Sequence, residues 1–513
     1  MLFHEPVFLY AFLPATLAAY LVLRRGVSDE ATAWLLLLAS LVFYGWWDPR
    51  LVPLLLASII LNHRLGARIA ADPRTAAAGR LLVLGVAINL GVLGLFKYTD
   101  FIVETANLVA GAQITRPGLP LPLGISFFTF LQIAFLVDCR QRAIRQPGLR
   151  DYALFVAYFP HLIAGPLVHH SELIPQFRRR AGRDALWENL AVGATIFVIG
   201  LAKKTLLAQP AADYADRVFN TAAAGGAPSL LEAWIGTLAF TFQIYFDFSA
   251  YSDMAIGLSR LFGIWLPVNF ASPYKATSII DFWRRWHITL SRFLRDYLYV
   301  ALGGNRRGVA RRYANVMIVM LLGGLWHGAG WTFVIWGGLH GAFLAINHAW
   351  RDWRGAHARP ASAAGRWVGR LLTFLTVTVL WVPFRADGLA TTISLWRGLV
   401  GLNGVVLPEH YAAIGPLVAL APLGVRFAAV PLYGGGWQLA ELATALAIVW
   451  LLPNTQEILR GHAPALNFQP PILGRLPAWR PGALMGLATG LFAAFLFART
   501  LQKQPGEFIY FQF

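Results

Sequence analysis

Long apolar stretches recur along almost the whole sequence, and they constrain its fold more than any other feature. A transmembrane helix needs about 20 mostly apolar residues. Such stretches lie at 5–23, 31–47, 80–97, 186–208, 230–250, 368–384, 436–453 and 482–500. Hydrophobic residues make up 57% of the 513 residues and charged residues only 13%, which is not the usage of an average soluble domain. We predict an all-α polytopic integral membrane protein with roughly 10–13 membrane helices.

The excess of basic residues predicts an orientation in the membrane. Lysine and arginine number 43 against 25 acidic residues. Most of this excess lies in short connections, where basic residues mark the cytoplasmic side. These connections are Arg24–Arg25, 140–150, 177–183, 284–312 and 351–370. We expect all of them inside the cell, with the lipid bilayer rather than nucleic acid as the partner of this basic chain.

The stretch 152–177 breaks the membrane pattern. It lies between two basic connections but has too few apolar residues to cross a bilayer twice. Pro160, Gly165 and Pro166 would interrupt a helix, and non-helical backbone at membrane depth is tolerated only when it is buried in protein or lines a cavity. We predict a re-entrant segment whose histidines line an internal chamber, and a kinked span is the alternative. The histidines are His161, His169 and His170.

A charged amphipathic segment follows at 281–300, "DFWRRWHITLSRFLRDYLYV". Helical periodicity places His287 with the apolar residues of one face, and we expect Asp281 to cap the helix. The segment is too charged to span a membrane, so we predict a helix at the cytoplasmic interface. An interfacial anchor needs no histidine on its apolar face, which makes His287 a candidate functional residue.

Residues 314–350 form an apolar segment dotted with glycine and long enough for two tight crossings. The glycines let neighbouring backbones approach closely, but they do not explain His327, which would lie well inside the membrane. In one regular helix His327 and His340 would lie about 140° apart around the axis. We therefore expect that they do not act as a pair.

Several long motifs resemble the membrane-bound O-acyltransferase (MBOAT) superfamily. "FWRRWHITLSRFLRDYLY" and, about 40 residues later, "GLWHGAGW" match its central region. Other motifs resemble its bacterial alginate O-acetylation branch, the AlgI type: "FPHLIAGPLVHHSELIPQF", "FDFSAYSDMAIGL", "GGNRRG" and the ending "FIYFQF". The resemblance implies one MBOAT-type domain over 1–513, with a catalytic core at about 120–350 and C-terminal spans and tail at 366–513. It also implies helices and re-entrant segments around a central chamber.

The resemblance implies catalytic roles for two histidines. The superfamily's histidine in its "LWHG" motif matches His327, and its second polar position, which is Asn, Asp or His, matches His287. The chemistry agrees, because an acyl thioester is already activated and a neutral imidazole can deprotonate the attacking hydroxyl. We expect acetyl-CoA as the donor substrate, no permanently bound cofactor, and donor contacts at Arg284, Arg285 and Trp286.

Four other polar residues stand in apolar surroundings and are functional candidates by default. They are Gln132, Asp138, Asp247 and Asp253. For Asp138 we favour a structural pairing with an arginine. No HExxH or CxxC spacing occurs, so we predict no metal site. The single cysteine, Cys139, excludes an intramolecular disulfide.

Within the family, the expected activity is transfer of an acetyl group across the bacterial inner membrane, by a multi-pass enzyme, to an exported polysaccharide such as alginate. Peptidoglycan, cellulose and D-alanylation of teichoic acid are alternatives, as is a non-enzymatic transporter or scaffold. We expect a periplasmic or membrane-anchored acetyltransferase partner. Tyr510, in the tail "FIYFQF", is a candidate acyl carrier, and an aromatic membrane anchor is the other interpretation.

Overall fold

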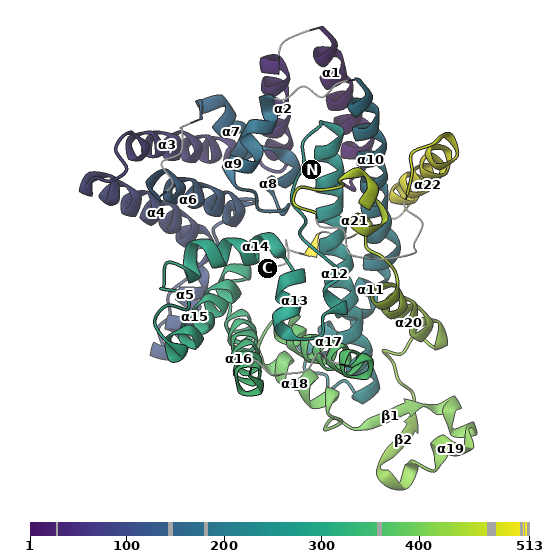
Figure 1. Ribbon diagram of the computed structural model, residues 1–513. Helices are drawn as coiled ribbons and strands as arrows, with labels where there is room; N and C mark the ends of the chain where they lie inside the picture. The colour runs from purple at the N-terminus through teal and green to yellow at the C-terminus, as the bar shows by residue number, and fades with distance from the viewer. Residues whose placement is uncertain are drawn as a thin grey trace. The chain divides into compact units, whose positions relative to one another are not determined.

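The computed structural model describes residues 1–26, 29–141, 147–178, 183–355, 362–468, 479–502, 506, 508 and 509. These residues are mostly helical (Figure 1), which confirms the all-α class. The chain forms two compact units. Unit 1 comprises Met1–Leu201, Ala250–Asn269 and Thr455–Pro505, and unit 2 comprises Ala202–Ser249, Phe270–Asn454 and Gly506–Phe513. The expected core at 120–350 contributes to both, and a single domain over 1–513 stays a prediction.

Each of the eight apolar stretches of the sequence contains a helix. In the described part of the chain, five helices are long and apolar enough to cross a membrane: Pro49–Ala71, Ala76–Lys97, Ala185–Ala223, Ala363–Arg385 and Ala483–Gln502. Three shorter apolar helices are Phe8–Arg24, Glu30–Gly45 and Gly436–Leu451. The chain is therefore a membrane protein, and the total of 10–13 membrane helices stays a prediction.

Unit 1 is built mainly from the N-terminal helices. Its elements are η1 (Phe8–Phe12), α1 (Leu13–Gly26), α2 (Asp29–Gly45), η2 (Pro49–Leu51), α3 (Val52–Ala71), α4 (Ala76–Lys97), α5 (Thr99–Ala110), α6 (Ile125–Gln141), α7 (Leu149–Ala157), α8 (Phe159–Leu162), α9 (His170–Leu173), η3 (Ile174–Arg178), α10 (Arg183–Ala202), α21 (Thr455–Ile458), η9 (Arg460–His462) and α22 (Ala483–Gln502).

Helix α3 was not among the predicted apolar stretches. Its buried Asn62 exchanges side-chain hydrogen bonds of 3.2 and 2.7 Å with Asn89 of α4, and such amide pairs join helices inside a membrane protein.

The segment 152–177 is broken into the short helices α7, α8, α9 and η3 and is largely buried in unit 1. Helix α7 ends at Ala157, before Pro160, which has no N–H with which to continue the hydrogen bonds of α7. Pro160 then lies in the first turn of α8, where its missing N–H has no helical partner to lose. The break is confirmed, whereas re-entry into a membrane stays a prediction.

Unit 2 holds the other helices and one small parallel sheet. Its elements are η4 (Lys203–Ala208), α11 (Gln209–Ala223), α12 (Leu230–Leu261, which ends in unit 1), η5 (Pro273–Lys275), α13 (Ile279–Arg285), α14 (Ile288–Phe293), η6 (Leu294–Tyr299), α15 (Val309–His327), α16 (Trp331–Arg354), α17 (Ala363–Arg385), α18 (Leu389–Leu399), β1 (Val405–Pro408), η7 (Glu409–Ala413), α19 (Gly415–Val418), η8 (Ala421–Leu423), β2 (Val425–Ala428) and α20 (Gly436–Leu451). Strands β1 and β2 pair with Val405 opposite Val425.

Helices α15 and α16 form the hairpin expected at 314–350, and they lie side by side in Figure 1. Their backbones touch at two glycines. A Cβ atom on Gly324 would lie 2.2 Å from the carbonyl oxygen of Phe333, and one on Gly337 would lie 2.2 Å from that of Met320. Only glycine allows this approach, so the packing role predicted for the glycines is confirmed at these positions.

Candidate active site

His287 lies at a break in the helix that we expected over 281–300. Helix α13 ends at Arg285, Trp286 is extended, and α14 begins at Ile288. The side chain of Ser278, not that of Asp281, caps α13, because its oxygen accepts a hydrogen bond of 3.2 Å from the Asp281 N–H. The single helix and its Asp281 cap were therefore wrong.

The backbone of His287 explains the break. Its φ of 43° and ψ of 53° lie in the left-handed region, which most residues with a side chain avoid. Asparagine, aspartate and histidine occur there several times more often than other non-glycine residues. These are the three residue types expected at the second polar position of the family. The left-handed backbone at position 287 therefore favours the same residue types as the need for a polar side chain.

His327 is the last residue of α15, directly before the turn into α16. Its side chain is buried, and aromatic rings surround it. Ring centroids lie 4.9 Å away for Trp326, 5.1 Å for Trp336 and 5.3 Å for Phe384. The helix hairpin and α17 thus hold this imidazole in an apolar environment.

The structure brings His287 and His327 together within unit 2. Their ring centroids are 6.3 Å apart, and the ring of Phe248 packs 4.8 Å from that of His287. His287, which lies outside the candidate membrane spans, is fully buried, and burial lowers its pKa to about 3. His287 is therefore neutral at physiological pH and can exchange hydrogen bonds with a reacting group.

His340 has a hydrogen-bond partner of its own in α13. Its Nδ1 accepts a hydrogen bond of 3.2 Å from the Trp283 indole N–H. The ring of Trp336 contacts both His340, at 4.8 Å, and His327, at 5.1 Å. The structure thus pairs His327 with His287, and an indole packs against both His327 and His340.

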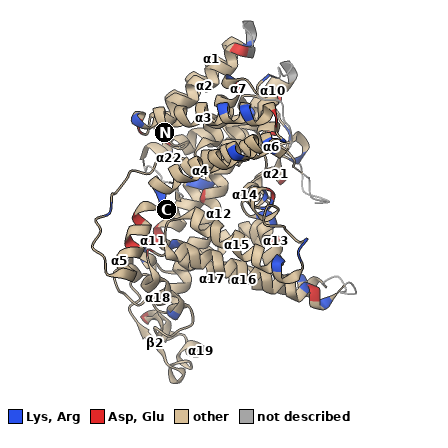
Figure 2. Ribbon diagram, turned by 90° about the vertical axis from the view of Figure 1, so that its left-hand side faces the viewer, with Lys and Arg blue, Asp and Glu red and all other residues tan. Residues whose placement is uncertain are grey.

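The three residues expected to bind the donor have different environments. Arg284 is exposed, and Arg285 pairs with Asp281 at 2.9 Å. Lysine and arginine, blue in Figure 2, gather around α13 and α14. Trp286, in contrast, is 1% exposed and packs against the rings of Phe270, Phe282 and Trp381. Trp286 thus belongs to an aromatic core beside His287, and donor binding by Arg284, Arg285 and Trp286 stays a prediction.

The other predicted polar residues, apart from Asp247, lie in unit 1 and contact other residues of that unit. One partner of Asp138 is His170, at 3.6 Å, and the pairing of Asp138 with an arginine stays a prediction. The remaining contacts join Gln132 to Ser58 at 3.0 Å, Asp253 to Gln456 at 2.7 Å, and His161 to the carbonyl oxygen of Phe155 at 3.0 Å. His169 caps α9. Among the described residues, no three His, Cys, Asp or Glu side chains gather as metal ligands would.

Asp247 of α12 has a partner that the sequence analysis did not single out. Lys204 of η4 lies 2.9 Å from its Oδ1 atom, and both side chains are at most 5% exposed. The sequence could have indicated Lys204 as a candidate. Lys203 and Lys204 interrupt the apolar stretch 186–208, and ionisable residues within such stretches are functional candidates. The Oδ2 atom of Asp247 accepts a hydrogen bond of 3.0 Å from the backbone N–H of Ile509.

The C-terminal segment therefore reaches the core of unit 2. Phe508 and Ile509 are at most 1% exposed. The ring of Phe508 lies 5.8 Å from that of Phe248, which in turn contacts His287. This confirms that the tail folds back into the protein as far as residue 509, whereas Tyr510 lies outside the described residues.

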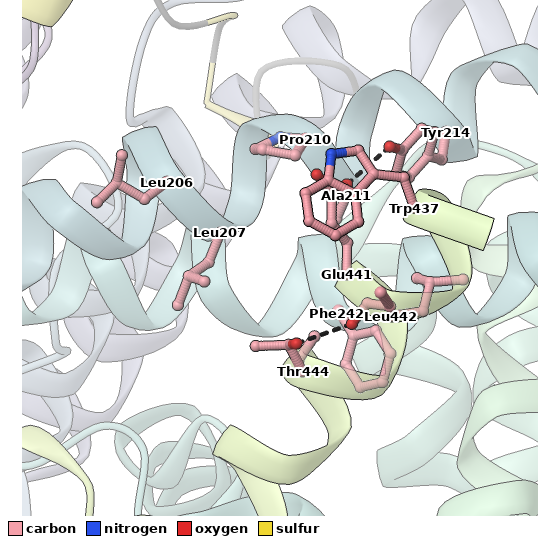
Figure 3. Close-up of a pocket in the computed structure, with 12 residues that line it drawn as sticks. Leu206, Leu207, Pro210, Ala211, Tyr214, Phe242, Trp437, Glu441, Leu442 and Thr444 are labelled. Atoms are coloured by element: carbon pink, nitrogen blue, oxygen red, sulfur yellow. Dashed lines mark hydrogen bonds between the residues drawn. The ribbon is translucent and has the colours of Figure 1, made fainter. Parts of the chain in front are cut away.

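A cavity of about 290 Å³ lies elsewhere in unit 2, between η4, α11, α12 and α20 (Figure 3). Most of its wall is aliphatic or aromatic. The Tyr214 hydroxyl donates a hydrogen bond of 2.7 Å to Glu441 across it. Neither His287 nor His327 lines this cavity, so the candidate active site is defined by the histidine pair and not by this cavity.

Comparison with known proteins agrees with this geometry. Residues 95–378 match the model of the membrane-bound O-acyltransferase family, MBOAT, a range that contains both histidines. A peptidoglycan O-acetyltransferase of Helicobacter pylori is 43% identical over 79% of this chain and 81% of its own. A probable alginate O-acetylase AlgI of Pseudomonas aeruginosa is 39% identical over 100% of both chains. A teichoic acid D-alanyltransferase of Streptococcus thermophilus is 26% identical over 51% of this chain and 67% of its own. The chain therefore belongs to the MBOAT family, is of the AlgI type, and is a membrane O-acyltransferase.

Proposed function

We propose that this enzyme takes an acetyl group from acetyl-CoA at the cytoplasmic face of the bacterial inner membrane and passes it outward to an exported polysaccharide. The observation that carries the proposal is the buried contact between His287 and His327, 6.3 Å between ring centroids. A transferase of this kind needs a neutral base in a site from which water is excluded, because water would hydrolyse the thioester.

In the proposed reaction, His327 accepts the proton of an acceptor hydroxyl as its oxygen attacks the thioester carbonyl. A carbon–oxygen bond forms, the carbon–sulfur bond breaks, and the proton passes from the imidazolium to the departing thiolate. His287 orients the reacting groups through its own ring nitrogens. Arg284 and Arg285 offer positive charge to the phosphates of the donor.

Alginate is our first candidate acceptor, because the similarity to the probable alginate O-acetylase spans 100% of both chains. Peptidoglycan is the second candidate, because the Helicobacter pylori relative has the higher identity, 43%. Ester-linked acetate measured in each polymer, with and without the gene for this enzyme, would decide between them. A periplasmic or membrane-anchored acetyltransferase that completes the transfer is part of the proposal.

Purified enzyme and acetyl-CoA labelled in its acetyl group provide the direct test. We expect label to move to the acceptor with wild-type enzyme and to be lost with His327→Ala. His340→Gln is the matched control, since His340 is a buried histidine of the same hairpin that hydrogen-bonds to Trp283. Transfer at the wild-type rate by His327→Ala would rule out the general-base assignment.

A further inference from the structure

An ion pair is buried where the surrounding residues are mostly apolar. Lys204 and Asp247 lie 2.9 Å apart with side chains 5% and 3% exposed. Removing two charges from water is unfavourable, and their mutual attraction offsets this only when further hydrogen bonds satisfy the remaining atoms. Charged residues inside membrane proteins are for this reason commonly functional.

The carboxylate of Asp247 makes a second contact that explains why a charge is present. Its Oδ2 atom accepts the backbone N–H of Ile509 at 3.0 Å, while Lys204 lies against Oδ1. A hydrogen bond to a charged acceptor is stronger than one between neutral groups. Because the donor is a backbone N–H, this contact recognises the main chain of the tail rather than a particular side chain.

A second hydrogen bond holds the same segment three residues earlier. The backbone N–H of Gly506 donates to the Oε1 atom of Gln209 at 2.7 Å. Gln209 lies one π-helical turn after Lys204, because its own N–H bonds to the Lys204 carbonyl. Pro210 follows directly and cannot donate to the preceding turn, which agrees with a local departure from the α-helical pattern. One helical turn thus carries two of the three residues that hold the tail.

The tail is held beside the histidine pair. Phe508 lies between the anchored residues Gly506 and Ile509, and its ring packs 5.8 Å from that of Phe248. The ring of Phe248 in turn packs 4.8 Å from that of His287. The contacts of Gly506, Phe508 and Ile509 therefore fix the point from which the chain continues to Tyr510.

We propose that Lys204, Gln209 and Asp247 form a latch that binds the backbone of Gly506 and Ile509 and so positions the rest of the tail for acyl transfer. The three are positioning residues, since they act through the tail. The inference rests on the proposed function for its consequence in transfer, but the docking itself can be measured without any donor.

The latch predicts that Ile509 is shielded only while Asp247 is intact. Ile509→Cys keeps the backbone N–H, and the native cysteine is removed by Cys139→Ser. We expect a maleimide to label this full-length protein slowly in detergent micelles, and at least ten times faster after Asp247→Ala or Lys204→Met. Asp216→Asn is the matched control, because Asp216 pairs with Arg385 elsewhere in unit 2 at 2.7 Å, and it should leave labelling slow.

A second reporter separates release of the tail from general unfolding. Leu395 of α18 is fully buried, so Leu395→Cys should stay protected in the Asp247→Ala background. If Leu395→Cys becomes labelled in the Asp247→Ala background, that substitution has unfolded the protein. The milder Gln209→Ala, which removes only the contact to Gly506, then shows whether the tail is released without unfolding. Unchanged protection of Ile509→Cys in both the Asp247→Ala and Gln209→Ala proteins would refute the latch.

Transfer assays distinguish failure of the latch from failure of the proposed function. We expect Asp247→Ala to lower kcat with little change in the KM for acetyl-CoA, and His327→Ala to abolish transfer while Ile509→Cys stays protected. In an enzyme that already lacks residues 506–513, Asp247→Ala should cause no further loss of transfer. An additional loss would contradict the latch, whereas absence of transfer by the wild-type enzyme would contradict the function and leave the labelling result standing.

Discussion

The imidazole rings of His287 and His327 lie 6.3 Å apart between centroids, although 40 positions separate the residues in the sequence. One ring is supplied by a non-helical connection and the other by the end of a helix. Two imidazoles in one apolar site can divide the work, so that one moves a proton while the other holds the reacting groups. The four predictions below follow from this arrangement and from the helices that support it.

Substitution of His287 should separate its backbone role from its chemical role. His287→Asn should fold normally and keep part of the activity, because asparagine tolerates the left-handed backbone and retains a polar side chain. His287→Val should destabilise the protein by about 1–3 kcal/mol, since a β-branched residue is strained in that conformation. Thermal unfolding and acetyl transfer, measured on both variants, check this. Loss of activity in the asparagine variant as complete as in His327→Ala would instead indicate direct proton transfer by His287.

Filling the contact between α15 and α16 should destabilise the hairpin. In Gly337→Ala the new methyl group would meet the Met320 carbonyl oxygen at 2.2 Å, and overpacking of this kind costs about 1–3 kcal/mol. Gly94→Ala is the control, because a Cβ there meets nothing within 4 Å. We expect a lower Tm for the first variant only, and equal Tm values would show that the helices can separate without cost.

Accessibility of the basic segment around the start of α15 tests the orientation. Arg306 and Arg311 are exposed and should face the cytoplasm because of the surrounding positive charge. Arg306→Cys and Arg311→Cys should react with an impermeant thiol reagent in inverted membranes and not in intact cells. Labelling from the periplasm would reverse the proposed direction of transfer.

Tyr510→Phe tests the carrier hypothesis for the tail. The substitution keeps the ring and removes the hydroxyl that would accept the acetyl group as an aryl ester. If Tyr510 carries the group, polymer acetylation should be lost while membrane assembly and tail docking remain normal. Full acetylation by this variant would leave the tail an aromatic anchor.

The sequence alone predicted the elements that depend on local periodicity. The apolar stretches, the hairpin at 314–350 and the break within 152–177 follow from hydrophobic length, glycine and proline. Helix α3 was missed because Asn62, His63 and Arg64 interrupt its apolar run, and the hydrogen bonds from Asn62 to Asn89 that offset this polarity are tertiary contacts.

The errors around the candidate site have the same physical origin. The helix over 281–300 was wrong because no glycine or proline marks the turn at His287, whose left-handed backbone depends on its surroundings. Lys204 was overlooked because its partners, Asp247 and through it Ile509, are distant in sequence. Hydrophobic periodicity predicts the helix to which a residue belongs. It does not predict which distant residue will pair with its charge.

The glycine contacts between α15 and α16 also limit how the site can open. Where a carbonyl oxygen sits against a backbone that has no side chain, one helix cannot slide past the other without first lifting away. His327 therefore moves with the whole hairpin. Spin labels on α15 and α16 should therefore keep a constant separation through the reaction cycle.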